Sequence, residues 1–400
     1  MRLLRRGDFA LLVAGSSLNA IGSWATIIAV WGYAAYRFHA GSGEIAVLGL
    51  AWSAPGALLS PIAGVPIDRI GPRRVLILSD LVGVMASLSM AAAGRFSTLV
   101  ALAFVSGAVQ AFGQPAAMSL PARVVEDADL LAANALLGAA EQSAIVFGPL
   151  VAAVAIGAWG IRAPFLFDAA TFVAGALAVA PVRLHPVAPV VRRAARVELR
   201  EGLGLARSIR DVRRTLALAG AVFFTWGAFF VLEPLYVRDV LHRSAALLGL
   251  FQTAFGIGLV GATLTLPALG DRVASLRVLS LSVALSGLAA ATYVGTPSVF
   301  VAFVGVFLWG VDVAFFLPPM QTVLQRATPV EAHGRVLGLA STLESWGSLL
   351  AIPLTGLVVA SIGVSRTGAL VGAIAIAAGI GGVVRSRRTR VPAGAPSTVG

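Results

Sequence analysis

Carboxylates inside long apolar segments are the residues of this sequence best suited to chemistry. Glu141, Glu344 and Asp312 each interrupt such a segment. Ionisable side chains within membrane-spanning segments are costly and usually functional. A carboxylate in this position could take up and release a proton. It could also hydrogen-bond to a neighbouring helix and serve packing alone.

Other reactive residue types are scarce. The sequence has no cysteine, and its four histidines are scattered without metal-ligand spacing. It contains no glycine-rich phosphate loop of the GxxxxGK[ST] type. No convergent set of nucleophile, base and metal ligands is visible, which argues against an intramembrane enzyme. We therefore expect no metal site and no cofactor.

The composition is that of a membrane protein. Of the 400 residues, 58% are hydrophobic and only 12% are charged, and the mean hydropathy is +0.90. A soluble globular domain carries roughly 25% charged residues. The net charge of +12 does not indicate nucleic acid, because the arginines form short clusters between apolar runs and no basic face. The sequence predicts an all-α integral membrane protein in a lipid bilayer.

Twelve segments are long and apolar enough to cross a bilayer, which takes about 20 residues. The first six are expected at residues 9–36, 45–67, 75–93, 97–121, 132–158 and 163–181. The second six are expected at residues 215–237, 246–269, 274–294, 298–322, 335–360 and 366–384. Of the 30 arginines, the outer loops then hold only Arg37, Arg95, Arg162, Arg238, Arg243 and Arg366. This asymmetry predicts a multi-pass protein of the cell (inner or plasma) membrane with both termini cytoplasmic.

The acidic residues of the predicted spans lie at different depths in the membrane. Glu141 and Glu344 lie about nine residues, or roughly 14 Å, from the cytoplasmic starts of their spans, near the middle of a core about 30 Å thick. Glu233 and Asp239 are expected at the outer surface. We expect Asp168, in the sixth span, to serve structure.

A polar stretch from Pro181 to Arg214 separates the first six spans from the second six. It begins Pro-rich and ends amphipathic, which predicts a cytoplasmic linker with a short surface helix. The expected organisation is an N-terminal six-helix bundle at 1–181, the linker at 182–214, a C-terminal six-helix bundle at 215–386 and a disordered tail at 387–400.

The two halves repeat one another. A shift of 203 residues aligns Asp68 with Asp271 and Glu141 with Glu344. General similarity between apolar helices does not explain coincident charged residues. Two six-helix halves in the same orientation are related by an axis along the membrane normal, an arrangement that resembles the major facilitator fold.

The segment "GVPIDRIGPRR", residues 64–74, resembles the G-x-L-a-D-R-x-G-R-R signature between helices 2 and 3 of the major facilitator superfamily. The matching residues are Gly64, Asp68, Arg69, Gly71, Arg73 and Arg74. Pro66 and Pro72 depart from the signature. The second copy keeps Asp271 and Arg272, with Arg326 at the position that corresponds to Arg123.

This resemblance implies a conformational latch on the cytoplasmic side. In the family, the aspartate meets the N-terminus of helix 11 and an arginine that ends helix 4. Here those partners would lie near Gly334 and at Arg123. A carboxylate at a helix N-terminus is favourable by about 0.3–1 kcal/mol. Anchoring of the arginines at the membrane surface is the simpler interpretation, but it does not explain Asp68.

Longer matches narrow the resemblance to the drug:proton antiporter branch, which includes macrolide efflux proteins and siderophore exporters. They include "QPAAMSLPARVVEDADLLAANAL", "FLFDAATFVAGAL" and "AIVFGPLVAA". The last resembles the helix-5 antiporter motif, which is matched at Gly148 and Pro149, with alanines at three glycine positions. In the family this motif is associated with export, whereas helix packing alone is the alternative. The small-residue run "GLFQTAFGIGLVGA" on the eighth span could be its partner.

Polar and aromatic residues in the spans could form a cavity that suits a large amphipathic molecule. The main candidates are Asn19, Gln114, Trp226, Trp309 and Gln321. A wider set adds Gln110, Gln142, Gln252, Trp24, Trp31 and Phe223. Asp312 lies on a helix that lines the cavity in the family, and it joins Glu141 and Glu344 as a candidate for proton coupling.

Residues and resemblance together predict a secondary active exporter of small amphipathic compounds, either drugs or siderophore-like metabolites. Proton antiport and alternating access would drive it. The expected partners are a small-molecule substrate, protons and the lipid bilayer, with no nucleic acid, and we expect a monomer. An importer or uniporter of a metabolite is the alternative within transporters. A membrane sensor or an intramembrane enzyme is the alternative from another class.

Overall fold

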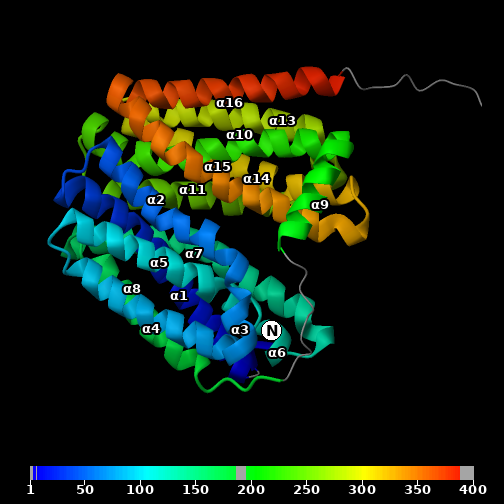
Figure 1. Cartoon of the computed structure of the whole chain (residues 1–400). Helices are drawn as coiled ribbons and strands as arrows, with labels where there is room; N and C mark the ends of the chain where they lie inside the picture. Colours follow the sequence, from blue (N-terminus) through cyan, green and yellow to red (C-terminus); the bar gives the residue numbers. More distant parts are fainter. Residues whose placement is uncertain (1–2, 6, 186–194, 388–400) are drawn as a thin grey trace, which may run out of the picture.

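The computed structural model describes residues 3–5, 7–185 and 195–387, and these residues form helices and short connections (Figure 1). Residues 186–194 of the predicted linker lie outside the described residues. So does the predicted tail, 387–400, apart from its first residue.

The helices follow one another with few long connections. The first half contains η1 (Leu3–Arg5), α1 (Gly7–Gly32), η2 (Tyr33–Arg37), α2 (Ser42–Leu59), η3 (Ser60–Ile62), α3 (Gly64–Ile70), α4 (Pro72–Ala91), α5 (Phe96–Met118), α6 (Pro121–Val124), α7 (Asp127–Trp159) and α8 (Ala163–Val179). Then comes α9 (Ala195–Ser208). The second half contains α10 (Arg210–Leu235), η4 (Tyr236–Val240), α11 (Ala246–Thr263), α12 (Leu266–Leu269), η5 (Gly270–Val273), α13 (Leu276–Val294), α14 (Val299–Arg326), η6 (Val330–Ala332), α15 (His333–Ile362) and α16 (Val364–Arg387). Helices suit a bilayer because each one satisfies its own backbone hydrogen bonds.

Eleven helices of the described chain are long and apolar enough to cross a membrane. The expected sixth span, 163–181, is present as α8, but this helix has only 17 residues. The predicted count of twelve spans is therefore not confirmed.

Two of the other predicted spans end earlier than expected. The helix predicted at 45–67 stops at Leu59, and the helix predicted at 246–269 stops at Thr263. In both places a proline lies in the first turn of the short helix that follows. Proline has no backbone N–H to donate, so it favours the start of a new helix over continuation of the old one.

The internal repeat is visible in local geometry. Residues Tyr33–Arg37 and Tyr236–Val240, which are 203 positions apart, both form π-helical turns. Both turns are followed by a histidine with positive φ, His39 at 52° and His242 at 51°. The hydroxyl of Tyr33 donates to the Ala93 carbonyl at 3.0 Å, and that of Tyr236 donates to the Thr296 carbonyl at 2.6 Å, again at matching positions.

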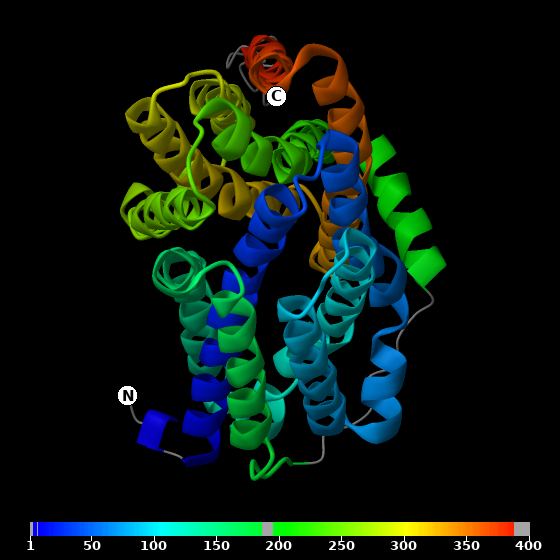
Figure 2. The same ribbon diagram turned by 90° about the vertical axis from the view of Figure 1, so that its left-hand side faces the viewer.

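The two halves form two bundles that lie side by side (Figure 2). We call the end that contains α3, α6 and α9 the linker end, and the end that contains η2 and η4 the far end (Figure 1). One apolar core runs through both halves toward the far end. Toward the linker end each half has a separate core of its own. The halves are thus joined at the far end and apart at the linker end.

Small residues bring helices of the two halves together. Helix α7 packs on α11, and α2 packs on α15. A Cβ atom at Gly249 of α11 would lie 2.4 Å from the carbonyl oxygen of Pro149 on α7. One at Gly356 of α15 would lie 2.8 Å from the Cβ atom of Ala46 on α2. Small residues at such crossings let helix backbones approach closely. The predicted pairing of the fifth and eighth spans is confirmed.

We predict that Gly249→Val lowers the melting temperature of the purified protein in detergent. The added side chain would push α11 away from α7, and overpacking of this kind costs about 1–3 kcal/mol. Gly261→Val is the matched control, because it lies in the same helix and an added Cβ atom there meets nothing within 4 Å. Equal melting temperatures for the two variants would contradict the packing argument.

Candidate functional site

A cavity of about 610 Å³ lies between the two halves. Helices α1, α2, α5 and α7 line it from the first half, and α10, α11, α14 and α15 line it from the second. A cavity of this size fits the range of small-molecule sites. Its place between separately packed bundles means that relative movement of the halves changes its access.

Aromatic rings dominate the cavity wall. The lining tryptophans are Trp24, Trp31, Trp52, Trp226 and Trp309, together with Phe229, Phe230 and Phe255. The ring centroids of Phe229 and Trp309 are 4.2 Å apart, and those of Trp31 and Phe230 are 5.5 Å apart. The indole Nε1 atoms of Trp226 and Trp309 are buried and have no hydrogen-bond partner among the described residues.

Polar groups on the wall are few and include no positive charge. They comprise the carboxylates Glu233 and Glu344, the amides Gln110, Gln114 and Gln252, and several serines. Among the described lining residues, none is arginine or histidine. Aromatic faces and carboxylates both attract cations, so the wall favours an apolar molecule that carries a positive charge.

Glu233 lies inside the protein, contrary to the expectation that it faces the outer surface. It is 9% exposed and lines the cavity. Its Oε1 atom accepts from the Tyr293 hydroxyl at 2.8 Å, and its Oε2 atom accepts from the Gln252 amide at 2.6 Å. The expectation was wrong because η4 continues the seventh span to Val240, beyond its predicted end, so Glu233 lies further from the end of the helix than expected. Trp226 lies two helical turns earlier, on the same face of α10, and this spacing could have identified Glu233.

Hydrogen bonds between the halves close the cavity at the far end. The Arg238 guanidinium donates to the carbonyls of Ala35 and Ala40 at 2.9 Å and 2.8 Å. The same group is paired with Asp239, whose Oδ1 atom lies 2.5 Å from Nε. The Tyr36 hydroxyl donates to the Arg243 carbonyl at 2.6 Å. These bonds join η2, η4 and the residues just after them, which are equivalent parts of the repeat.

The three proton-coupling candidates lie in different surroundings. Glu344 lines the cavity on α15. Glu141 is exposed on α7 and is not among the lining residues. Asp312 is 1% exposed, and its Oδ1 atom accepts from the Ser282 hydroxyl at 2.5 Å. Its helix, α14, lines the cavity as expected, but the Asp312 side chain is turned away from the cavity toward α13.

Three of the five main cavity candidates line the cavity: Gln114, Trp226 and Trp309. Asn19 does not, because its amide donates to Asp80 Oδ1 at 2.9 Å on the other side of α1. Gln321 is exposed and also lies outside the lining set. From the wider set, the cavity includes Gln110, Gln252, Trp24 and Trp31 but not Gln142 or Phe223. Hydropathy identifies polar residues in spans but not the face on which they lie.

The latch residues of the first half lie at the linker end. They are Gly64, Asp68 and Arg69 in α3, Gly71 with φ 88° at the turn, and Arg73 and Arg74 at the start of α4. Arg73 donates to the Val182 carbonyl at 2.9 Å. Asp68 is exposed and has no ion-pair or hydrogen-bond partner within the described part of the chain. Neither Arg123, in α6, nor Gly334, near the start of α15, is paired with it.

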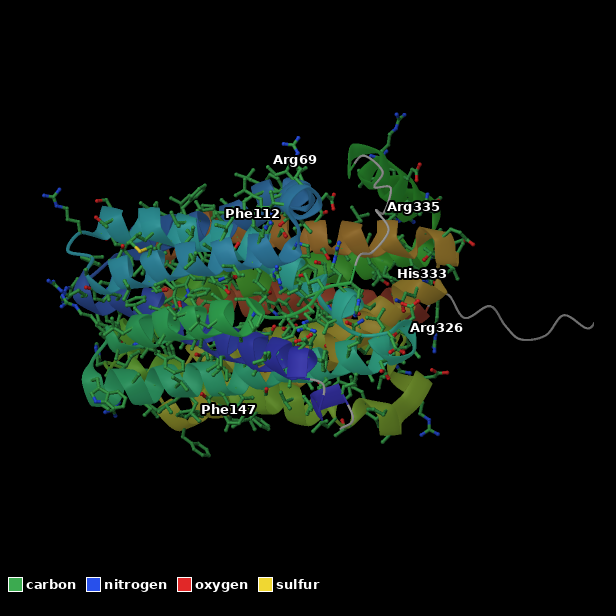
Figure 3. All side chains as sticks on the ribbon, turned by 90° about the horizontal axis from the view of Figure 1, so that it is seen from below. Arg69, Phe112, Phe147, Arg326, His333 and Arg335 are labelled. Carbon is green, nitrogen blue, oxygen red and sulfur yellow. The ribbon has the colours of Figure 1, made fainter. Side chains whose placement is uncertain are left out.

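The second copy differs from the first. Asp271 Oδ1 lies 2.5 Å from Arg326 Nη2, so the second half forms the ion pair that Asp68 and Arg123 lack. Arg272 is exposed beside this pair. Figure 3 shows Arg326, His333 and Arg335 toward the linker end of the molecule. Here Arg335 forms an ion pair with Glu201 of α9, which ties the predicted linker helix to α15.

The two motif residues on α7 face different neighbours. A Cβ atom at Gly148 would lie 2.4 Å from the Cβ atom of Trp24 on α1. The carbonyl of Pro149 faces Gly249 on α11 instead. The motif therefore packs one helix against both halves of the protein.

Sequence comparisons identify relatives over most of the chain. The family model for the Major Facilitator Superfamily matches residues 12–242 and 215–399. Macrolide efflux protein A of Streptococcus pyogenes is 23% identical over 344 residues, which cover 80% of this chain and 82% of that protein. The multidrug efflux pump Tap of Mycobacterium tuberculosis is 26% identical over 385 residues, which cover 89% of this chain and 88% of the pump.

Solved structures share the fold at low sequence identity. A mutant of the nucleoside transporter NupG matches with a TM-score of 0.80 and 11% identity, over 94% of this chain and 99% of that one. A POT family transporter in complex with 5-aminolevulinic acid matches with a TM-score of 0.75 and 12% identity, over 96% of each chain. The family model matches both halves of the chain, and the structure has two repeated bundles with a cavity between them. This multi-pass membrane protein therefore belongs to the major facilitator superfamily of transporters.

Proposed function

We propose that this chain is a secondary active exporter of small amphipathic compounds that works by proton antiport and alternating access. The observation that carries the proposal is the aromatic cavity between two bundles, closed at the far end by η2 and η4. Movement of the bundles would open the far end and close the linker end. A transporter needs two such states of similar free energy.

The relatives favour export. Two of them are named for efflux, one of macrolides and one of many drugs. Gly148 and Pro149, which match the export-associated motif, lie where α7 meets α1 and α11. The fold itself does not favour one direction, since a nucleoside transporter and a POT family transporter share it. An importer or uniporter of a metabolite is the alternative, while a sensor or an enzyme has less support.

We propose that α8 is a twelfth span and that the linker end faces the cytoplasm. At 1.5 Å per residue, 17 residues extend about 26 Å, and bilayers adapt to mismatches of a few ångströms. Most arginines then lie on the cytoplasmic side, as the positive-inside rule requires. The far end would face outward, and the cavity would be accessible from the cytoplasm of the cell, where an exporter collects its substrate.

Carboxylates near the cavity would exchange protons for substrate. Glu344 and Glu233 line the wall, while Glu141 and Asp312 remain candidates at other positions. Glu233 also lies among aromatic rings with no positive side chain beside it on the wall, which suits the ammonium group of an amphipathic substrate. Binding of a cation there would favour release of protons from nearby carboxyl groups.

Siderophore-like metabolites are a second class of possible cargo, alongside drugs such as macrolides. We propose a monomer, because each chain encloses a complete cavity between its own two halves. The latch, which involves Asp68, Arg123 and Gly334, would close the linker end in the alternate state.

The first test compares cells with and without this chain. We expect lower accumulation of a macrolide and of a cationic dye in cells that contain it. In proteoliposomes, addition of an exported compound should release protons. Unchanged accumulation across a broad panel would contradict export, and higher accumulation would indicate import. The absence of any pH change with compounds that the cells do export would contradict proton antiport.

Glu233→Gln should weaken binding of the cationic dye ethidium by about tenfold or more. Loss of a charge-assisted hydrogen bond costs about 1.5–3 kcal/mol, and about 1.4 kcal/mol is a factor of ten. Quenching of tryptophan fluorescence measures the affinity, because five tryptophans line the cavity. The affinity for an uncharged compound of similar size should fall by less than about threefold. Glu331 is an exposed acid off the cavity, and Glu331→Gln should change neither affinity. Equal losses for charged and uncharged compounds would contradict a charge-selective role.

The latch is tested by cross-linking Asp68→Cys to Gly334→Cys, in a chain with no cysteine of its own. The cross-linking yield should be low when these two substitutions are the only ones, because the linker end is then open. It should rise when Arg238→Ala removes the far-end bonds to Ala35 and Ala40, because their loss favours the alternate state. Equal yields in the two backgrounds would refute the latch.

A further inference from the structure

A second, smaller cavity lies within the first half, away from the central one. It has a volume of about 10 Å³, which is room for about one water molecule. Helices α1, α2, α4, α5 and α8 enclose it, and Asp168 of α8 is the only acid among its described lining residues. We call it the side pocket.

Asp168 is 1% exposed, and only one of its two carboxylate oxygens has a hydrogen-bond partner among the described residues. Its Oδ2 atom accepts from the Ser87 hydroxyl at 2.7 Å, but its Oδ1 atom has no hydrogen-bond partner within the described chain. The Thr26 hydroxyl, which also lines the side pocket, makes no hydrogen bond of good geometry either, although it lies near enough to Asp168 to interact with the carboxylate. Gly22 makes room for this arrangement, since a Cβ atom there would lie 2.7 Å from Asp168 Oδ1.

A second buried acid accompanies it. Asp80 of α4 is 2% exposed, and its Oδ2 atom is also without a partner in the described residues. Its Oδ1 atom accepts from Asn19, and it lies close enough to Asp168 for their charges to interact. The other groups that face the two acids are uncharged: Asn19 and Thr26 on α1, Ser87 on α4 and Gln110 on α5.

Two ionised carboxylates in this site would carry a large free-energy cost. Buried charges are costly without an opposite charge or a full set of hydrogen bonds, and each acid here has one unpartnered oxygen. The pair should therefore hold at least one proton. Each acid also has an unpartnered oxygen that can carry that proton.

The side pocket is also adjacent to the central cavity. Gln110 and Trp52 line both. Helix α1 contributes to both as well, with Ser23 and Thr26 on the side pocket and Trp24 on the central cavity. A shift of α1 on substrate binding would change the surroundings of Asp168.

We propose that Asp168, with Asp80 beside it, is a proton-binding site of the N-terminal half, separate from the carboxylates on the central cavity. On release, the carboxyl O–H bond breaks, the electron pair stays on the carboxylate, and the proton passes to a water in the side pocket and past Gln110 to the central cavity. On uptake the sequence reverses. This inference rests on the proposed antiport and adds to the cavity carboxylates a second proton site that coupling requires.

The test uses the full-length protein in proteoliposomes, with radiolabelled erythromycin as the probe and Asp168→Asn as the variant. In the wild-type protein, a pH gradient of about one unit can drive about tenfold accumulation per exchanged proton. Asp168→Asn should abolish this accumulation, so that the ratio of inside to outside concentration is about one. The rate of exchange of labelled for unlabelled erythromycin should stay within about threefold of the wild-type rate. Asp80→Asn should weaken coupling in the same way. Asp127→Asn, at the exposed start of α7, is the matched control and should leave both unchanged.

The outcomes separate the two proposals. Full accumulation by Asp168→Asn would overturn the side-pocket site and leave antiport intact, whereas a wild-type protein that never accumulates the probe would contradict antiport itself. Parallel loss of accumulation and exchange would indicate a structural role and also overturn the site. Should Asp168→Asn fail to fold, Ser87→Ala replaces it, since it removes the 2.7 Å donor but keeps the carboxyl. It should shift the pH profile of proton release without altering exchange, and an unchanged profile would overturn the proposal.

Discussion

The hydrocarbon around these helices offers no hydrogen-bond partner, and the rest of the structure depends on this constraint. Backbone groups are satisfied within helices, and most buried polar side chains find partners inside the protein. Glu233 uses Tyr293 and Gln252, and the matched tyrosines Tyr33 and Tyr236 bond to carbonyls at equivalent positions. Against this background, Asp80, Asp168 and Asp312 are exceptions, since each has one buried carboxylate oxygen without a partner among the described residues.

The same constraint explains how two bundles can be joined and still move. Each half buries a core of its own at the linker end, and only the far-end core is shared. The contact between halves relies on small residues such as Gly249 and on a few hydrogen bonds from Arg238 and Tyr36. Such contacts can be exchanged for others at the opposite end without disturbing the helices themselves. The unequal state of the two latch copies, with Asp271 paired and Asp68 free in the described chain, fits a molecule open at the linker end.

Helix positions were predictable because long apolar runs and arginine clusters mark where the chain enters and leaves the membrane. The internal repeat was predictable from coincident charges, and the structure extends it to the π-helical turns. Predictions failed where local chemistry ended a helix, as at the prolines after Leu59 and Thr263. The predicted sixth span is present as the short helix α8. Glu233 was misplaced because the ends of spans are the least determined part of a hydropathy pattern.

The sequence by itself determined the fold family, the repeat and the residue types available to a cavity, because period, hydropathy and charge are local properties of the chain. Only the tertiary structure decided which side chains meet. Rotation of each helix about its axis turns Gln114 and Trp226 into the cavity, but it turns Asn19 toward Asp80 and Asp312 toward Ser282. That rotation is set by packing between helices distant in sequence, and the pattern within a single helix shows which residues share a face but not where that face points.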